Sequence, residues 1–473
     1  MSRSGVAFLG ILCCSSALAD RLYSDGFEIP VIAPLFPLVD GEFQLPPGPT
    51  ADQLAWVLSE LAVGETTTFA EIDAHFDASW SVSDQDTQNF FASLRSSYPN
   101  AVATDVIAVT PVRVTVVIDA PGSGAPYGFV NLGARYTGAQ GIVQFGVSNY
   151  GGSVQYPEDQ NLTLSEAADK FTTLSGSPAL LVARIQPDGQ CLPLADRNAS
   201  QLRATASIFK IWVLGGVARA VAEGTLATED LIAMVASELA PGGTINVEPP
   251  GTLFSVADLA TLMMGISDNT ATDLLHEQVG RTLIGELIND YDVAQPEILT
   301  PLLGISEQFH LLSSFPLDVS QAYVNGTEAY QQQFLEEEIE PLGSLVGDPM
   351  PYFHESLLTS GTWRASPMDV CHAFAHLRRL PQGSDAIELV DRALGAQATQ
   401  PEVRNAWDRV WYKGGSLNTN TELRVLTHAW MLQNSAEDPY VVVAMSNSDA
   451  GDIDDFKVQS VTGRMLQLLA EMP

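Results

Sequence analysis

The sequence predicts a small α+β domain followed by a larger α/β domain, which has a five-stranded antiparallel sheet flanked by helices and an all-helical part. With 473 residues, 46% of them hydrophobic, the chain is long enough for more than one core. Helix-like segments precede strand-like segments between residues 51 and 148, the order expected of a small α+β domain. Beyond residue 164, strand-like segments stand at both ends of a long helical stretch, so they can pair into one sheet.

The first domain is expected to have three helices and four strands. Apolar residues recur at helical spacing in segments 54–61, 69–76 and 90–94. Segments 102–109, 113–118, 128–132 and 142–147 are rich in β-branched residues and are separated by Pro and Gly, which favours an antiparallel sheet. We expect an extended lead-in without regular elements over 20–50, and a linker over 149–163.

The second domain, 164–473, is expected to begin with a hairpin of strands 179–186 and 191–195. A helical region should follow from about Thr205 to Ala398, and strands should return at 410–413, 424–433 and 440–446. An amphipathic helix closes the chain, with its apolar residues at Phe456, Val461, Met465, Leu468 and Leu469.

Residues 1–19 resemble a signal peptide, so we expect a secreted or periplasmic protein. Arg3 precedes an apolar run over 6–14, and small residues stand before Asp20. The alternative, a membrane anchor, is disfavoured because the run is shorter than the roughly 20 residues that span a bilayer. We expect no membrane span in the mature chain. Cys191 and Cys371 then remain, either as one disulfide or, as we favour, as two buried small side chains, but not as a metal site.

The net charge of -35 argues against nucleic acid as a partner, because phosphates would be repelled. The chain has only four lysines, so the positions of two of them are informative.

The motif Ser207-Ile208-Phe209-Lys210 opens a segment that is apolar nearly all round, as in a helix buried within a protein. The i,i+3 spacing places Ser207 and Lys210 on one face. A helix N-terminus has unpaired N–H groups, and a desolvated lysine can lose its proton and act as a base. Ser207 is therefore a candidate nucleophile with Lys210 as its base.

Two further motifs follow in an order and spacing that chance seldom produces. Ser267-Asp268-Asn269 comes sixty residues later, and Lys413-Gly414-Gly415-Ser416 lies where a strand is expected beside the serine.

With these motifs the region from about Leu164 to the C-terminus resembles the active-site serine β-lactamases, especially class A, and the penicillin-binding D,D-peptidases. The resemblance implies that Ser207 is acylated, that Lys210 is the nearest base and that Ser267 relays a proton to the leaving group. It also implies a catalytic role for Lys413, which holds the substrate carboxylate and supports Ser267. Asn269, Gly415 and Ser416 are implied to bind the substrate: Asn269 orients its amide, and the backbone N–H groups of Ser207 and Ser416 form the oxyanion hole. No cofactor and no metal are implied.

The chain departs from the class A pattern at two places. The loop around Glu297 has no Asn to complete the deacylation motif, and we interpret Glu297 as a solvent-facing loop residue. Gly414 replaces the usual Thr or Ser, which removes a hydroxyl near the substrate carboxylate. Fast β-lactam turnover is therefore not supported.

Segments 53–58, 69–72 and 75–76 resemble the N-terminal isomerase-like or cystatin-like domain of two-domain β-lactamase-like proteins, a group that includes one associated with clavulanic acid biosynthesis. This resemblance implies an esterase or acyl hydrolase.

We therefore expect a secreted serine hydrolase acting on a β-lactam, a D-Ala-D-Ala peptide or a small ester, with a small molecule or peptidoglycan fragment as its partner. The alternative is a non-hydrolytic penicillin-binding or sensor protein that stays acylated or only binds cell-wall peptides. We interpret His372 and His376 as residues of a core helix rather than metal ligands, and the acidic stretch 318–340 as a solvated helix face rather than a lid.

Overall fold

The computed structural model describes residues 36, 38–39, 42–123, 127–149, 154, 156–346, 350–361, 363–397, 401–434 and 438–472. The predicted signal peptide and most of the lead-in lie outside the described residues. The expectation that 20–50 lacks regular elements is wrong in part, because two short strands, β1 (Leu38–Val39) and β2 (Glu42–Phe43), pair with each other and α2 (Pro49–Glu60) begins before residue 51.

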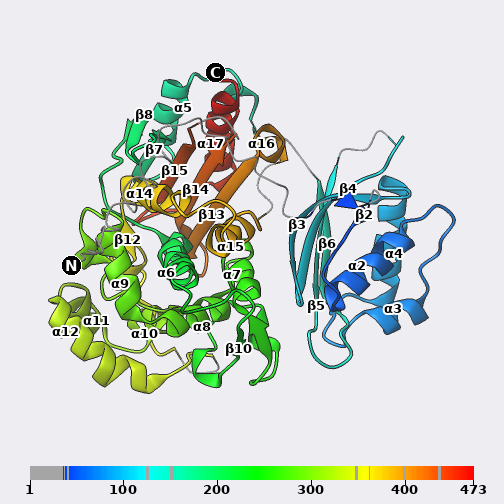
Figure 1. The fold of residues 1–473 in the computed structure, drawn as a ribbon, viewed down its shortest axis with the longest axis horizontal. Coiled ribbons are helices and arrows are strands. Elements are labelled where there is room, and N and C mark those ends of the chain that lie inside the picture. The colour runs from blue at the N-terminus through cyan, green and yellow to red at the C-terminus, as the bar shows by residue number, and fades with distance from the viewer. Residues whose placement is uncertain are drawn as a thin grey trace, which may run out of the picture.

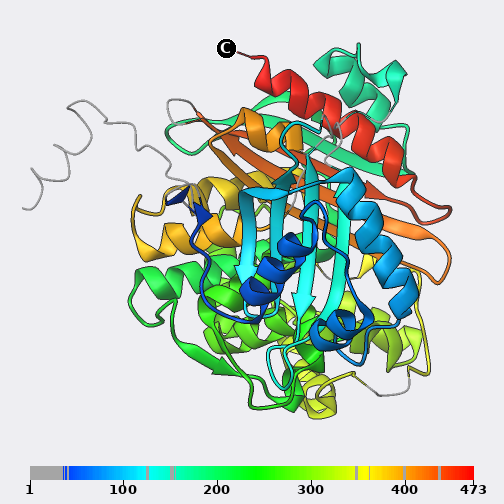
Figure 2. The same cartoon turned by 90° about the vertical axis from the view of Figure 1, so that its right-hand side faces the viewer.

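The N-terminal part is a four-stranded antiparallel meander with helices on one face (Figure 2). Its helices are α2, α3 (Phe69–His75) and α4 (Asp84–Ser97), and its strands, in sheet order, are β3 (Val102–Thr110), β4 (Arg113–Asp119), β5 (Gly128–Ala134) and β6 (Ile142–Asn149). Thr68 begins α3 with a reciprocal capping box to Glu71. The covered face buries Val114, Val116 and Val130 beneath the helices. The likeness of this part to an isomerase-like or cystatin-like domain stays a prediction.

The C-terminal part contains the predicted five-stranded antiparallel sheet, in the order β13-β14-β15-β7-β8 (Figure 1). The strands are β7 (Ser177–Ile185), β8 (Cys191–Arg197), β13 (Arg409–Asn418), β14 (Leu423–Gln433) and β15 (Tyr440–Asn447). One face packs on α5 (Leu164–Phe171) and α17 (Asp455–Ala470), and the other on the helical region. Phe456 does not join the apolar face of α17, because it is 62% exposed at the first turn.

The helical region surrounds α6 (Lys210–Ala222), which is buried on nearly all sides. Its other helices are α7 (Val256–Gly265), α8 (Asn269–Val279), α9 (Arg281–Asp290), α10 (Ile305–Ser313), α11 (Leu317–Val324), α12 (Glu328–Phe334), α13 (Leu357–Ser360), α14 (Pro367–Arg378) and α15 (Asp385–Leu394). Helix α16 (Pro401–Ala406) lies apart from this region and packs against α17. Short strands interrupt the helical region, contrary to expectation: β9 (Arg203–Ala204) pairs with β12 (Arg364–Ala365), and β10 (Leu231–Ala233) pairs with β11 (Leu253–Ser255). Short 3-10 helices lie at η1 (Pro157–Asp159), η2 (Ala206–Phe209), η3 (Ala236–Glu238), η4 (Ile245–Val247), η5 (Pro296–Ile298) and η7 (Glu340–Leu342), and one π-helix at η6 (Leu335–Ile339).

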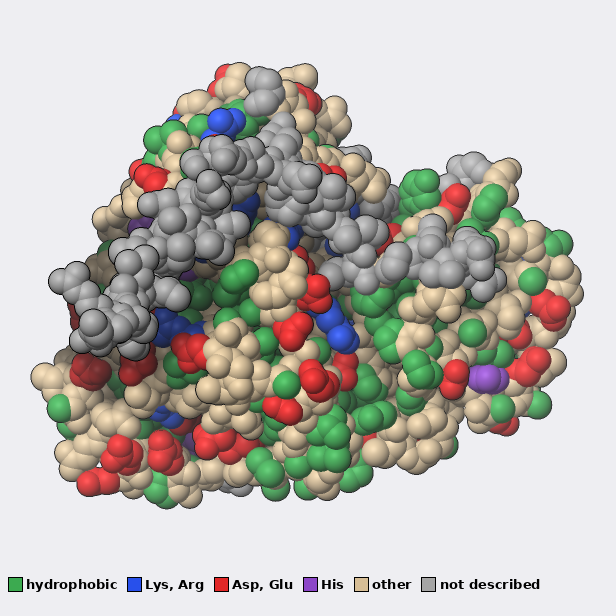
Figure 3. All heavy atoms as spheres, viewed as in Figure 1, with side chains coloured by type: hydrophobic (Ala, Val, Ile, Leu, Met, Phe, Trp, Pro, Cys, Tyr) green, Lys and Arg blue, Asp and Glu red, His purple; other side chains and the backbone are tan. Residues whose placement is uncertain are grey.

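Side chains of the C-terminal part contact the N-terminal part at several points. Arg392 of α15 donates to Val109 O and pairs with Asp258 of α7. Glu248 accepts hydrogen bonds from the backbone amides of Tyr136 and Thr137. Figure 3 shows the two parts meeting along a furrow, on a surface where acidic side chains outnumber basic ones. The domain boundaries at 149 and 164 stay a prediction.

No helix among the described residues is both long enough and apolar enough to cross a membrane.

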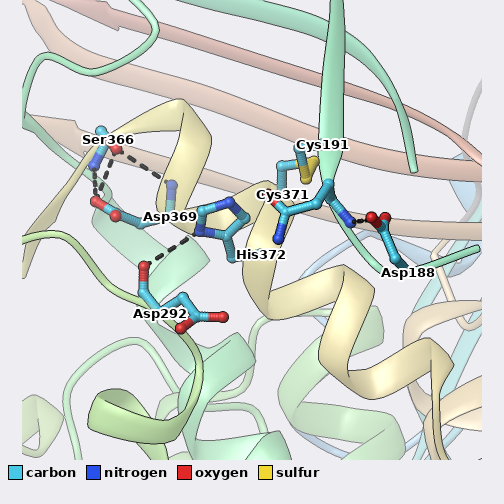
Figure 4. The surroundings of a disulfide bond; sticks show 8 residues. Asp188, Cys191, Asp292, Ser366, Asp369, Cys371 and His372 are labelled. Atoms are coloured by element: carbon cyan, nitrogen blue, oxygen red, sulfur yellow. Dashed lines mark hydrogen bonds between the residues drawn. A yellow bond between two sulfur atoms is a disulfide. The ribbon is translucent and has the colours of Figure 1, made fainter. Parts of the chain in front are cut away.

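Cys191 of β8 and Cys371 of α14 form a disulfide, with their Cα atoms 6.4 Å apart (Figure 4). The preference for two unbonded cysteines was therefore wrong. Both side chains are buried, as expected, but the antiparallel hairpin brings the start of β8 against α14, a contact that sequence separation conceals. The bond links residues 180 positions apart and so fastens the sheet to the helical region.

Replacing both cysteines by serine is expected to lower the free energy of unfolding by about 2–5 kcal/mol, because the unfolded chain regains the entropy of a long open loop. Urea denaturation of wild type and double variant measures this. A reductant should shift the wild-type midpoint and leave that of the variant unchanged. Equal midpoints for wild type and variant would show that the disulfide does not stabilise the fold.

Candidate active site

Ser207 lies in η2, directly before α6, on a turn that the surrounding structure holds firmly. The helix expected to begin at Ser207 therefore starts as a 3-10 turn. Ala206 has a φ of 44°, which a non-glycine residue adopts only when its surroundings impose it. Thr205 donates through its amide (2.9 Å) and hydroxyl (2.7 Å) to Trp363 O, and the Trp363 ring stacks on Phe209 at 4.0 Å. Ser207 itself is half-buried.

Lys210 is fully buried one turn after Ser207, and its ammonium nitrogen is directed at the Ser267 motif. Nζ donates to Ser267 O at 2.7 Å, to Ser267 Oγ at 3.1 Å and to Asn269 Oδ1 at 2.7 Å. Ser207 Oγ has no hydrogen-bond partner among the described residues. The structure thus joins Lys210 to Ser267 and Asn269 and leaves the Ser207 hydroxyl available.

The Ser267 motif is fixed by hydrogen bonds at its own residues. Ser267 has a φ of 59°, and Asp268 caps α8 by accepting from Ala271 N at 2.9 Å. Asp268 also accepts from the amides of Thr244 and Ile245, and Asn269 Nδ2 donates to Pro241 O at 2.6 Å. The loop at 240–248 therefore orients the amide that contacts Lys210.

Lys413 reaches the same serine from β13. Its Nζ donates to Ser267 Oγ at 3.1 Å and to Gly414 O at 2.6 Å, and the side chain is 1% exposed. One hydroxyl is thus shared by two buried lysine side chains, and in the described chain no carboxylate forms an ion pair with either of them.

Burial controls the protonation of this pair. Loss of solvation lowers the pKa of Lys210 to about 7, although the Asp268 and Asp273 carboxylates nearby act in the opposite direction. Burial and the charge of Lys210 also lower the pKa of Lys413 well below its usual value. Because the two titrations are coupled, a proton on one lysine disfavours a proton on the other. The site can therefore hold a neutral amine near physiological pH.

Gly415 allows β13 to approach the Ser207 turn closely. A Cβ at this position would lie 2.5 Å from Ser207 N and 2.9 Å from Thr205 O. Thr427 Oγ1 donates to Thr205 O at 2.8 Å and to Gly415 O at 3.2 Å, which ties the strands to the turn. The backbone of Gly415 and Ser416 consequently lies beside the amide of Ser207.

Gly415→Ala is expected to destabilise the fold by about 1–3 kcal/mol, because a methyl group would force β13 away from the Ser207 turn. Gly176→Ala is the matched control, since a Cβ there meets nothing within 4 Å. Scanning calorimetry of both variants measures the difference. Equal melting temperatures would mean that β13 does not need this close approach.

The structure explains why residue 414 is a glycine, which the sequence does not reveal. A Cβ here would lie 2.5 Å from the hydroxyl of Tyr412, which is bonded to His428 Nδ1 at 2.7 Å. Burial and the charge of Lys413 lower the pKa of His428 to about 4, so this imidazole is neutral. The alternation of β13 indicates that Tyr412 shares a face with Gly414, but only the strand register identifies His428 as its partner.

Glu297 lies in η5 and is exposed, as expected for a loop residue. His372 and His376 of α14 contact Asp292, whereas Phe374 and Leu377 on the same helix are buried. Among the described residues no group of three or more His, Cys, Asp or Glu could hold a metal ion.

Asp273 is a further buried group that the sequence did not single out. It accepts hydrogen bonds from the amides of Ile305 (2.6 Å) and Ser306 (3.0 Å), yet burial raises its pKa to about 7.

Comparison with known proteins identifies the class to which this fold and site belong. The model of the Beta-lactamase enzyme family matches residues 176–461, which include the motifs at Ser207, Ser267 and Lys413. The chain therefore belongs to the β-lactamase enzyme family, and the resemblance drawn from its motifs is confirmed. No curated protein matches.

Several solved structures are similar. A β-lactamase from Chitinophaga pinensis has 15% identity over 64% of this chain and 97% of that chain, with a TM-score of 0.43. PBP-A has 16% identity over 65% of this chain and 97% of that chain, with a TM-score of 0.42. The ancestral class A β-lactamase GNCA has 18% identity over 65% of this chain and 99% of that chain, with a TM-score of 0.43.

Proposed function

We propose that the protein is a serine hydrolase that forms an acyl-enzyme at Ser207. One observation carries this proposal: Lys210, one turn from Ser207, is fully buried, has its pKa lowered to about 7, and contacts Ser267. A neutral amine keeps two N–H donors for Ser267 O and Asn269 Oδ1. Its lone pair, with Ser267 Oγ at 3.1 Å, can then accept a proton.

In this mechanism the Lys210 amine takes the proton of Ser207 Oγ as that oxygen attacks the acyl carbon. The amides of Ser207 and Ser416 stabilise the oxyanion, and Asn269 orients the substrate amide. Ser267, which contacts both lysines, passes a proton to the leaving group. Hydrolysis of the ester at Ser207 then releases the acid. No cofactor takes part.

The substrate is a small molecule or peptidoglycan fragment: a β-lactam, a D-Ala-D-Ala peptide or a small ester. Because Glu297 faces solvent, a class A deacylating base is missing from that loop, which favours slow deacylation of β-lactams. The second candidate function is a penicillin-binding sensor that stays acylated, and it rests on the same solvent-facing position of Glu297. Export to the periplasm or the outside of the cell completes the proposal, since the N-terminus resembles a signal peptide.

Incubation with penicillin G, followed by intact-mass spectrometry, tests acylation. Wild type should gain the mass of one penicillin, whereas Ser207→Ala should gain none, because the oxygen that accepts the acyl group is then missing. Ser200→Ala is the control, since Ser200 is exposed. A penicillin adduct that persists in Ser207→Ala would contradict the proposal. Decay of the wild-type adduct over hours distinguishes a hydrolase from a sensor.

The rate of acylation should rise with pH through about 7. Lys210 acts in its unprotonated form, and this form predominates above the lowered pKa. Stopped-flow or quenched measurements from about pH 5 to 9 give the profile. In Lys210→Arg the rise of the rate with pH should vanish, and the acylation rate should fall by a factor of about 100 or more. A wild-type profile that is flat between pH 5 and 9 would exclude Lys210 as the base.

A further inference from the structure

The sheet of the N-terminal part has a polar face turned toward the C-terminal part. In the strand register Thr115 is opposite Asn131, and Gly133 stands between Arg113 and Gln144, so these four side chains share one face. The opposite face carries Val114 and Val116 beneath the helices. This polar face lines a cavity of about 410 Å³. The opposite wall of the cavity is formed by Thr244, Gly265, Ile266, Ala396 and Gln397.

Part of the cavity wall is joined to the Ser267 motif through the chain and through a hydrogen bond. Gly265 and Ile266 directly precede Ser267, and the amide of Thr244 donates to Asp268. A group bound in this cavity would therefore contact the chain one or two residues before Ser267.

The hydrogen bonds among these polar side chains leave a buried donor of Arg113 unused. Arg113 donates from Nη1 to Gln144 Oε1 at 2.9 Å and from Nη2 to Asn131 Oδ1 at 3.1 Å. Thr115 Oγ1 also donates to Asn131 Oδ1, at 2.9 Å. Asn131 Oδ1 thus accepts two hydrogen bonds and Gln144 Oε1 accepts one, whereas Arg113 Nε is buried without an acceptor among the described residues. Asn131 and Gln144, whose amide nitrogens are donors, line the same cavity. Such a set of donors fits an anion.

Arg113 also differs from its neighbours in lacking a carboxylate partner. Arg392, Arg404 and Arg409, which lie along the same junction of the two parts, pair with Asp258, Asp105 and Asp391. Within the described chain Arg113 is held only by neutral amides, although the whole protein carries a net charge of -35. Its positive charge is oriented but not neutralised, in a half-buried position where solvent screens it weakly.

We propose that Arg113, with Asn131 and Gln144, binds a carboxylate of the substrate, so that the N-terminal part forms the anion-binding wall of the active site. This inference rests on the proposed acyl transfer to Ser207 and names its substrate class: an acyl compound with a free carboxylate remote from the scissile bond. The planar guanidinium and the two amide donors suit the oxygens of a carboxylate.

The test measures how the full-length protein hydrolyses two chromogenic esters. One is the mono-4-nitrophenyl ester of glutaric acid, and the other is the same ester with its free acid converted to the amide. Hydrolysis by water releases 4-nitrophenolate from both. Wild type should favour the acid by about tenfold or more in kcat/KM. Arg113→Gln should reduce this ratio to near one, and Arg113→Lys should keep part of it.

Arg135→Gln is the matched control. Arg135 lies at the same junction and donates to Val247 O, but it does not line the cavity, so its loss should leave the preference for the acid within about twofold of wild type. An equal loss of preference in Arg135→Gln and Arg113→Gln would assign the effect to the junction as a whole and overturn the proposal.

A binding measurement separates this inference from the proposed reaction. Calorimetry with Ser207→Ala should show tighter binding of glutarate than of glutaramide, and adding Arg113→Gln should remove the difference. If wild type hydrolyses neither ester but this difference is seen, acyl transfer fails and the anion site stands. If Ser207→Ala binds glutarate no better than glutaramide, the anion site is refuted, whatever the protein hydrolyses.

Discussion

The candidate site depends on one constraint: two lysine side chains are buried against a single serine hydroxyl. Two ammonium groups in that position would repel each other where water cannot screen them. Lowering the pKa of Lys210 to about 7 relieves the repulsion, because one nitrogen can then be neutral. The same loss of solvation that makes the lysine pair costly also makes it chemically useful, since a neutral amine can act as a base.

The rest of the fold holds this pair in place. Trp363 fixes the turn before Ser207, Gly415 lets β13 approach that turn, and the loop at 240–248 orients Asn269. Glu248 connects that loop to the N-terminal part through the amides of Tyr136 and Thr137. The N-terminal part therefore contacts a loop that positions a residue of the candidate site, which connects it structurally to that site.

Much of this could be predicted from the sequence. The periodicity of apolar residues predicted the two sheets, and the resemblance of three motifs to those of serine β-lactamases assigned Lys210, Ser267 and Lys413 to one site. The contacts of both lysines with the Ser267 hydroxyl are seen only in the structure. Pairings that depend on three-dimensional register could not be predicted: the Cys191–Cys371 bond, the Tyr412–His428 contact and the short strand pairs within the helical region all join segments distant in the chain. Gly414 looked like the loss of a substrate-binding hydroxyl, but the space is occupied by Tyr412. Arg113 had no motif around it, because its significance comes from what surrounds it in the folded protein.

The lysine pair can be examined directly, because the chain has only four lysines, Lys170, Lys210, Lys413 and Lys457. Labelling the lysine Cε carbons with carbon-13 and titrating the full-length protein by NMR would follow each side chain, with single Lys→Arg variants used for assignment. The account predicts one resonance, lost in Lys210→Arg, that titrates near pH 7, while the exposed Lys457 titrates above the usual lysine pKa. If the Lys210 resonance titrates like that of an ordinary surface lysine, the buried neutral amine does not exist and the account is wrong.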